Sequence, residues 1–248
     1  MRGSGAKLRA AALLALACAV PAAAAPGLAP MVSPTEPMAS APNAPWAYAG
    51  LPQQKPPATR YTVVELEGRR VLRVEADGSY GNLVHPLPGA AAGVLSWRWR
   101  VDTPLRAANL RTRQGDDAAL KVCALFNLPR AQVPFVERQL LRLAEARMSE
   151  ALPTATLCYV WDPSWPKGTV VLNAYTRRVR FITLGTTPGR WETERRELAT
   201  DFLRAFGDEA RTVPPLLAIA VGADADNTAG HSLGWVDALQ HEPPQNRP

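Results

Sequence analysis

Short runs of strand-forming residues recur along this chain at close spacing, separated by Gly, Pro, Asp and Asn. This pattern predicts a mainly β fold, an antiparallel jelly-roll-like β-sandwich of about ten strands. The chain lacks the regular alternation of strands with long helices that a parallel doubly wound sheet requires. The expected strands cover residues 61–66, 71–76, 94–101, 119–127, 156–161, 169–174, 179–184, 190–196, 216–222 and 233–239.

Two short helical insertions interrupt this series. The first covers residues 134–148, and the second is a shorter piece around Leu198, Phe202 and Phe206. Apolar residues at helical spacing indicate that both helices cover sheet edges or ends. In the first helix the apolar face consists of Val136, Leu140, Leu143, Ala144 and Met148.

The N-terminal residues have the composition of a secretory signal peptide. Arg2, Lys7 and Arg9 accompany the apolar run 8–20, and small residues follow at 21–25. Such a run is too short to span a bilayer stably, so residues 1–24 are expected to be removed after Ala24 and no transmembrane segment is predicted. The protein is therefore expected to be periplasmic or secreted. Alternatively, cleavage before Cys18 would leave a lipid-anchored form.

The chain after the signal is expected to contain one domain. Residues 25–45 are rich in Pro and Ala and predict a disordered linker, residues 46–241 fit a single β-sandwich domain, and residues 242–248 predict a flexible tail. The whole chain carries 28 Lys and Arg against 22 Asp and Glu. Removal of three basic residues with the signal leaves a small excess, so we predict no nucleic-acid partner. No pattern indicates a particular oligomeric state.

Strand alternation separates core residues from candidate binding residues. In the run 95–101, Trp97 and Trp99 share one face and are predicted to be core, whereas Arg98 and Arg100 share the other. Together with Arg177 and Arg180, these arginines form either a basic strip that grips an acidic ligand or a solvated face with cross-strand ion pairs to Glu192 and Glu194.

Polar and aromatic residues gather at loops and strand ends. Trp165 lies in a Pro- and Gly-containing loop, where it can stack on a sugar ring or pack back onto its own domain. Four polar groups accompany it, at residues 115–117, 173–177, 224–228 and 234–237. The candidate ligand-binding residues are Arg98, Asp116, Asp117, Trp165, Asn173, Tyr175, Asp224, Asp226, Asn227 and Trp235.

The aspartates allow three interpretations. Asp224 and Asp226 could present oxygens to one hard cation, so calcium is the possible cofactor, with no cofactor as the other expectation. Asp116 or Asp117 could pair with an acid of the 224–228 loop as general acid and base for glycoside cleavage. The third interpretation is that these residues cap turns by binding nearby backbone amides.

Other catalytic signatures are missing from the sequence. His85, His231 and His241 lack the paired spacing of a zinc site, and the chain has neither a Gly-x-Ser-x-Gly turn nor a phosphate-binding glycine loop. Cys123 and Cys158 both lie in predicted strands. They either form a disulfide in an oxidising compartment or remain a buried free pair.

Several ordered motifs resemble a bacterial exported family known as domain of unknown function 3047. The resemblance covers residues 46–239, the whole predicted domain, and the family supplies no established reaction. The motifs that carry it lie at residues 94–99, 115–117, 158–161, 173–176, 201–207 and 224–228.

An exported β-sandwich with aromatic, amide and acidic loop residues suits recognition of a polyol. The leading hypothesis is therefore noncatalytic binding of a cell-envelope or extracellular saccharide. The alternative is a carbohydrate-active enzyme, a glycoside hydrolase or polysaccharide lyase that uses the loop aspartates. A third hypothesis is a structural envelope protein whose polar loops only cap turns.

Overall fold

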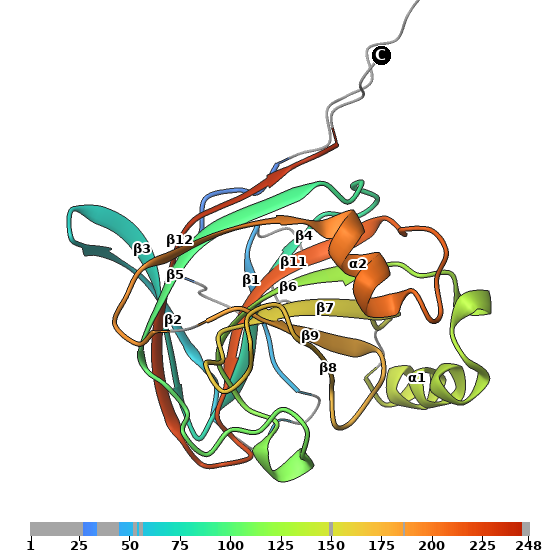
Figure 1. The fold of residues 1–248 in the computed structure, drawn as a ribbon, viewed down its shortest axis with the longest axis horizontal. Coiled ribbons are helices and arrows are strands. Elements are labelled where there is room, and N and C mark those ends of the chain that lie inside the picture. The colour runs from blue at the N-terminus through green and yellow to red at the C-terminus, as the bar shows by residue number, and fades with distance from the viewer. Residues whose placement is uncertain are drawn as a thin grey trace, which may run out of the picture.

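A computed structural model describes residues 27–33, 45–51, 54, 57–148, 151–185 and 187–244. Twelve strands in these residues form two sheets that pack face to face (Figure 1). The larger sheet has the order β1 (Ala47–Ala49), β4 (Tyr80–Pro86), β11 (Leu216–Asp224), β6 (Ala118–Phe126), β7 (Ala155–Val160), β9 (Val179–Thr183) and β8 (Val170–Leu172). The smaller sheet has the order β10 (Glu192–Glu197), β5 (Val94–Thr103), β12 (His231–Glu242), β3 (Arg69–Asp77) and β2 (Arg60–Leu66).

Neighbouring strands are antiparallel except for β7 and β9, which pair in parallel because β8 lies beyond β9 at the sheet edge. Strands adjacent in sequence often lie in different sheets, as β4 and β5 do. The predicted mainly β, jelly-roll-like sandwich is therefore confirmed.

The hairpin of β2 and β3 follows from its turn residues. Glu67 and Gly68 both have positive φ, 54° and 72°, which matches the right-handed twist of two strands joined by a two-residue turn. In contrast, β4 was not among the predicted strands. Its residues include Gly81, Asn82 and Pro86, which read as turn signals, but the strand pairs with β11 over its whole length.

The core between the sheets contains the predicted tryptophans. Trp97 and Trp99 of β5 are 1% and 0% exposed. The centre of the Trp97 ring lies 5.1 Å from that of Tyr159 in β7, so the contact joins the two sheets. The alternation of β5 between buried and half-buried residues thus agrees with the sequence pattern.

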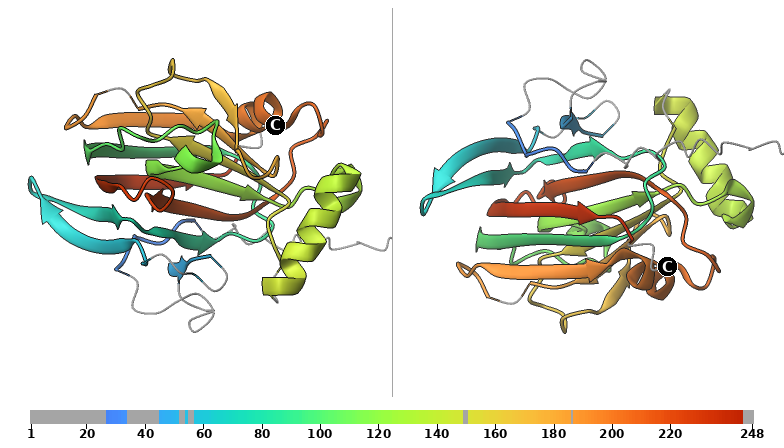
Figure 2. Two further views of the ribbon diagram at one scale, coloured as in Figure 1. Left: turned by 90° about the horizontal axis from the view of Figure 1, so that it is seen from below. Right: turned by 90° about the horizontal axis from the view of Figure 1, so that it is seen from above.

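Two α-helices, α1 (Phe135–Met148) and α2 (Leu198–Phe206), and two short 3₁₀ turns, η1 (Arg113–Gly115) and η2 (Arg130–Gln132), complete the described chain. In α2 the predicted apolar residues are buried, and Phe202 contacts Phe126 of β6 at 4.6 Å. Helix α1 lies at one end of the sandwich, beyond the strand ends (Figure 2).

The predicted orientation of α1 is wrong. Val136, Leu140 and Leu143, expected to cover a sheet edge, are exposed, and Leu141 is the large apolar residue of the helix that is buried. The side chain of Met148 lies outside the description. The physical reason is that two glutamates on the opposite face bind the body of the protein: Glu137 contacts Arg178, and Glu145 pairs with Arg130.

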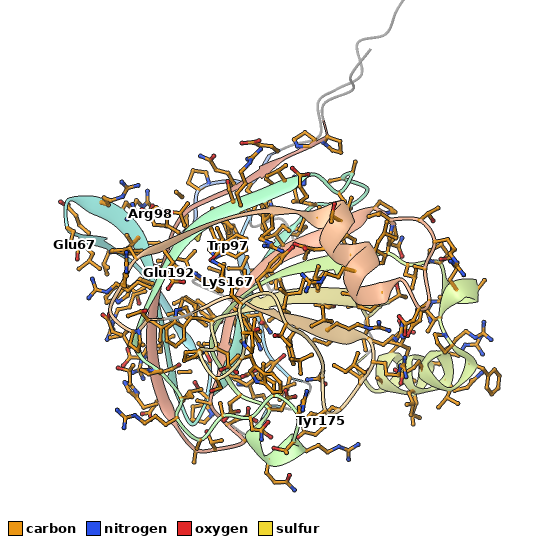
Figure 3. The ribbon with its side chains drawn as sticks, viewed as in Figure 1. Glu67, Trp97, Arg98, Lys167, Tyr175 and Glu192 are labelled. Carbon is orange, nitrogen blue, oxygen red and sulfur yellow. A yellow bond between two sulfur atoms is a disulfide. The ribbon has the colours of Figure 1, made fainter. Side chains whose placement is uncertain are left out.

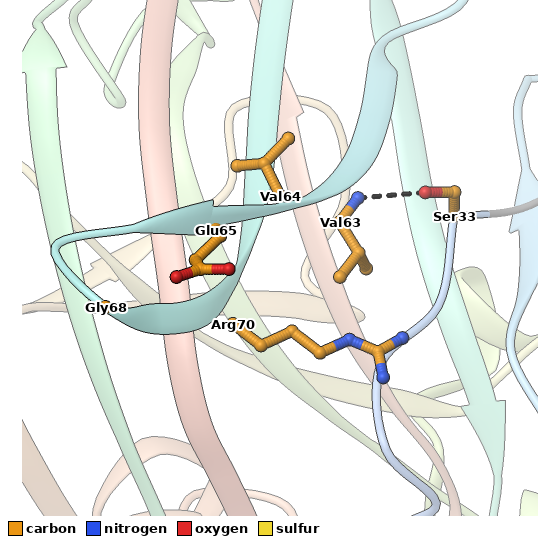
Figure 4. Close-up of a pocket in the computed structure, with 6 residues that line it drawn as sticks. All are labelled: Ser33, Val63, Val64, Glu65, Gly68 and Arg70. Carbon is orange, nitrogen blue, oxygen red and sulfur yellow. Dashed lines mark hydrogen bonds between the residues drawn. The ribbon is translucent and has the colours of Figure 1, made fainter.

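Part of the predicted linker is in contact with the fold. In the segment 27–33, the Ala29 amide donates to Nε2 of His85, and Ser33 Oγ accepts from the Val63 amide of β2 (Figure 4). An open hollow of about 580 Å³ lies between this segment and the β2–β3 hairpin. The predicted signal peptide, residues 1–24 with Cys18, lies outside the described residues.

Cys123 in β6 and Cys158 in β7 are directly opposite each other and form a disulfide. Of the two alternatives left by the sequence, the structure contains the bridge. No helix among the described residues is long and apolar enough to cross a membrane.

Candidate functional site

Three of the four predicted polar groups meet at one end of the larger sheet. Strands β11 and β6 are antiparallel neighbours, so the end of β11 at Asp224 lies beside the start of β6 at Ala118. The loop after β8 reaches the same place, because Asn173 Nδ2 donates to Asp116 Oδ2 at 2.5 Å. We call this group the loop cluster, and it consists of Asp116, Asp117, Lys121, Asn173, Tyr175, Asp224, Asp226 and Asn227.

Asp117 connects the segment before β6 to the 224–228 loop by hydrogen bonds. Its carboxylate is buried and accepts four hydrogen bonds: Oδ1 from the backbone and side-chain nitrogens of Asn227, both at 3.1 Å, and Oδ2 from the amide and hydroxyl of Thr228. All four of these donors belong to the 224–228 loop. Its contacts are therefore those of a structural cap, here spanning 110 residues of sequence.

Tyr175 has an exposed ring with a fixed hydroxyl. The residue (Figure 3) is 53% exposed, and its Oη lies 2.9 Å from both Asn227 Oδ1 and the Arg113 carbonyl oxygen. The Arg113 guanidinium lies 5.3 Å from the ring centre. Asn173 holds the preceding turn, since its Oδ1 accepts from the amides of Tyr175 and Thr176. The ring is thus held in place before any ligand arrives.

Asp116 is the unusual acid of the loop cluster. Burial, and then the nearby charge of Asp224, raise its pKa from 3.8 to about 6, against the lowering effect of the Asn173 hydrogen bond. Its Oδ1 atom is buried and has no hydrogen-bond partner among the described residues. A carboxyl group with this pKa holds a proton in mildly acidic solution.

A buried lysine lies behind the acids and was not among the candidate residues. Lys121 Nζ donates to Asp224 Oδ2 at 2.5 Å and lies 5.2 Å from the ring centre of Tyr80. Burial alone would lower the pKa of Lys121, but the Asp224 carboxylate outweighs burial, so the pKa of the lysine is raised. Burial also disfavours the charged form of Asp224 and therefore raises the pKa of this carboxyl group. The sequence did contain a signal for this residue, because Lys121 is the one charged residue in the apolar run of β6. A charge buried in such a strand needs a partner of opposite charge.

The neighbouring strand leaves space for this lysine. Gly222 of β11 lies opposite both Asn82 and Lys121, and a Cβ atom there would collide with the Asn82 amide and the Lys121 side chain. Glycine at this position therefore lets two polar side chains come together across β11.

The contacts of Asp224 bear on the calcium prediction. Its Oδ1 accepts from the Ala118 amide and its Oδ2 from Lys121, so a cation at Asp224 and Asp226 would have to displace an ammonium group. Among the residues that the structure describes, no group of three or more His, Cys, Asp or Glu side chains is arranged to hold a metal ion.

Three candidate residues do not join the loop cluster. Arg98 and Trp235 lie in the smaller sheet, where Arg98 pairs with Asp237 and stacks on Trp191, and Trp235 Nε1 donates to Asp102. Trp165 is half-buried against the outer side of the larger sheet, with the Arg111 guanidinium 4.3 Å from its ring.

The basic strip, one of the two alternatives that the sequence left open for these arginines, does not form. Arg98 and Arg100 belong to the smaller sheet, whereas Arg180 belongs to β9 of the larger sheet and pairs with Asp208 and Glu209. Arg177 also pairs with Asp208. These arginines are therefore separated by the fold and engaged in ion pairs.

A cavity of about 250 Å³ adjoins the loop cluster. Its lining includes Leu105 from the loop before η1, Asp117 from the segment between η1 and β6, and Trp161 and Asp162 from the loop after β7. Asp117 is the residue of the loop cluster that lines this cavity, so the cluster has a partly apolar neighbour on one side.

The protein is thus a two-sheet β-sandwich with a polar cluster at one end of its larger sheet. A family model described as "Protein of unknown function (DUF3047)" matches residues 44–240, and the chain belongs to this family. A comparison with curated proteins finds no match.

Several solved structures are similar to this chain at low sequence identity. The xyloglucanase domain of NopAA from Sinorhizobium fredii, in complex with cellobiose, is 10% identical with a TM-score of 0.38, over 77% of this chain and 92% of that one. A mutant carbohydrate-binding module of family 29 is 11% identical with a TM-score of 0.30, over 79% and 91%. A β-1,2-glucanase from Parabacteroides distasonis is 13% identical with a TM-score of 0.35; 81% of this chain aligns with only 23% of the glucanase.

Proposed function

We propose that this is an exported protein that binds a cell-envelope or extracellular saccharide at the loop cluster. The observation that carries the proposal is the exposed ring of Tyr175, held by its hydroxyl beside the Asp116 carboxyl and the Asn173 amide. Sugars are recognised by an aromatic face together with amide and carboxyl groups that bind hydroxyls. Because the ring is already fixed, binding costs less side-chain entropy than it would with a mobile ring.

The test is affinity electrophoresis of the full-length chain through gels cast with different neutral and acidic polysaccharides. We expect retardation in at least one polymer. Loss of the ring in Tyr175→Ala should raise the apparent dissociation constant about fivefold to tenfold, the effect of losing one aromatic contact. Trp235→Ala is the matched control, because this partly exposed aromatic lies in the other sheet. Free migration in every gel, or equal loss in both variants, contradicts the proposal.

One observation favours a second candidate, cleavage of the bound saccharide. Asp116 lies half-buried in the loop cluster and has a pKa of about 6, which suits a general acid for a glycosidic bond. If the protein cleaves, the same gels stained for remaining polymer will show a cleared zone. Asp116→Asn should then abolish clearing and keep the retardation, whereas retardation without clearing in the wild-type protein supports binding alone.

A further inference from the structure

Helix α1 presents large apolar side chains to solvent. Phe135, Val136, Leu140 and Leu143 are 66%, 67%, 52% and 53% exposed. Val136, Leu140 and Leu143 are spaced by four, three and seven positions and therefore form a stripe on one side of the helix, and Phe135, the first residue of the helix, lies at the edge of this stripe. We call this stripe the outer face of α1.

The charges of α1 are divided between its two sides. Glu137 accepts from the Thr176 hydroxyl and contacts Arg178, while Glu145 pairs with Arg130 and accepts from the Leu152 amide. Both acids are therefore neutralised against the body of the protein.

Two arginines flank the outer face. Arg142 is exposed, and the Arg138 guanidinium lies 5.8 Å from the Phe135 ring centre while it donates to the Arg130 carbonyl, an acceptor that carries no net charge. The solvent side of the helix is therefore mainly apolar, with Gln139 as its exposed polar residue and positive charge at its border.

We propose that the outer face of α1 docks on an anionic lipid surface. An amphipathic helix with Phe and Leu on one side and arginines at the border is the arrangement that inserts its apolar face among lipid headgroups and attracts anionic lipids. The helix stands at one end of the sandwich, beyond the strand ends (Figure 2), so a flat surface can reach its outer face. With 14 residues it lies along such a surface.

A second copy of the chain fits this face less well. A two-fold contact through the outer face would bring the arginines of both copies close together, which is repulsive. Four side chains of one helix also bury less area than the ~1,000 Å² expected of a stable interface.

The test measures flotation of the full-length chain with vesicles of phosphatidylcholine alone and with vesicles that also contain phosphatidylglycerol. Every variant retains residues 1–24, so any binding by the N-terminal apolar run is common to all of them. Leu140→Asp with Leu143→Asp should reduce partition to the anionic vesicles at least about tenfold, because two apolar side chains no longer insert. The matched control is Leu172→Asp with Leu203→Asp, two exposed leucines outside α1.

Substitution of the two arginines tests the role of charge independently. Arg138→Gln and Arg142→Gln should each weaken binding to the anionic vesicles about fivefold and leave binding to neutral vesicles unchanged. The proposal is overturned if the α1 and control variants bind equally, or if wild-type protein binds neutral and anionic vesicles equally. It is also overturned if sedimentation shows a dimer that only the α1 variant loses, since the partner is then a second copy. Unchanged melting temperatures confirm that the variants are folded.

Discussion

Asp201 of α2 joins three elements of the fold. Its carboxylate is 3% exposed and accepts from the Tyr159 hydroxyl of β7 at 2.8 Å and from Arg196 of β10, Nε at 2.8 Å and Nη2 at 2.7 Å. The residue therefore links the helix to both sheets. Asp201→Ala removes all three hydrogen bonds and leaves the arginine and the phenol without their acceptor.

The cost of this substitution follows from the burial of the pair. Breaking a buried ion pair by removing one partner costs ~3–5 kcal/mol, because the remaining charge is uncompensated. The Arg196 side chain is 22% exposed and regains some water, so we expect a loss near the lower end, about 3 kcal/mol. Tyr159→Phe removes one hydrogen bond to a charged acceptor and should cost about 1.5 kcal/mol.

Urea denaturation with linear extrapolation measures both effects. The double variant should be less damaging than the sum of the single ones, because the phenol and the carboxylate share one bond. Glu242→Ala is the control, since its pair with Arg195 is exposed on both sides and should contribute less than about 1 kcal/mol. A loss below about 1 kcal/mol for Asp201→Ala, or strict additivity with Tyr159→Phe, would refute this account of the contact.

Three further outcomes are expected. Replacing both Cys123 and Cys158 by alanine opens a link between residues 35 apart and should lower the free energy of unfolding by roughly 3 kcal/mol in the oxidised protein; equal urea midpoints for the two proteins would contradict this. Because burial raises the pKa of Asp116 from 3.8 to about 6, the folded state keeps a proton in this window that the unfolded state has lost, so stability falls as pH rises through it. As the pH rises from 3.8 to about 6, the melting temperature of Asp116→Asn should therefore increase relative to that of the wild-type protein. A difference that does not change with pH would show that Asp116 has an ordinary pKa. Gly68→Ala puts a side chain at φ 72° and should cost about 1 kcal/mol with no steric contact involved; an unchanged denaturation midpoint would show that the turn accepts a Cβ atom.

Local patterns predicted those parts of the fold that local physics controls. Glu67 and Gly68 stand between the predicted strands 61–66 and 71–76, and their turn needs only its own backbone angles, so the first hairpin could be predicted from these local signals. The alternation of Trp97 and Trp99 with arginines likewise defined which face of β5 is buried, because successive side chains of a strand point to opposite sides.

The assembly of the loop cluster was not predictable from spacing. Asp116 and Asn173 are separated by 57 residues and Asp117 and Asn227 by 110, and no local rule specifies which strands become neighbours. Polar type and position at strand ends selected most of the residues that the fold brings together in the loop cluster. They also selected Trp235, which lies in the other sheet, and they passed over Lys121.

The orientation of α1 shows a different limit. Its sequence offers an apolar face with Leu140 and Leu143 and a second face with Leu141 and two glutamates. Periodicity favours the face with more apolar residues. The structure uses the other one, because Arg178 and Arg130 on the body of the protein provide partners for the glutamates.

The segment 27–33, which lies against β2, protects one edge of the sandwich from pairing with strands of other copies. Strand β2 is an edge of the smaller sheet, and an open edge offers unpaired amides to any passing strand. One of these amides, that of Val63, donates to Ser33 Oγ. The opposite edge, β10, carries several charged residues, and the edges of the larger sheet, β1 and β8, are three residues each. Loss of the segment 27–33 would therefore uncover the one long edge that relies on another part of the chain for protection, and fibre-like association through β2 would be the expected result.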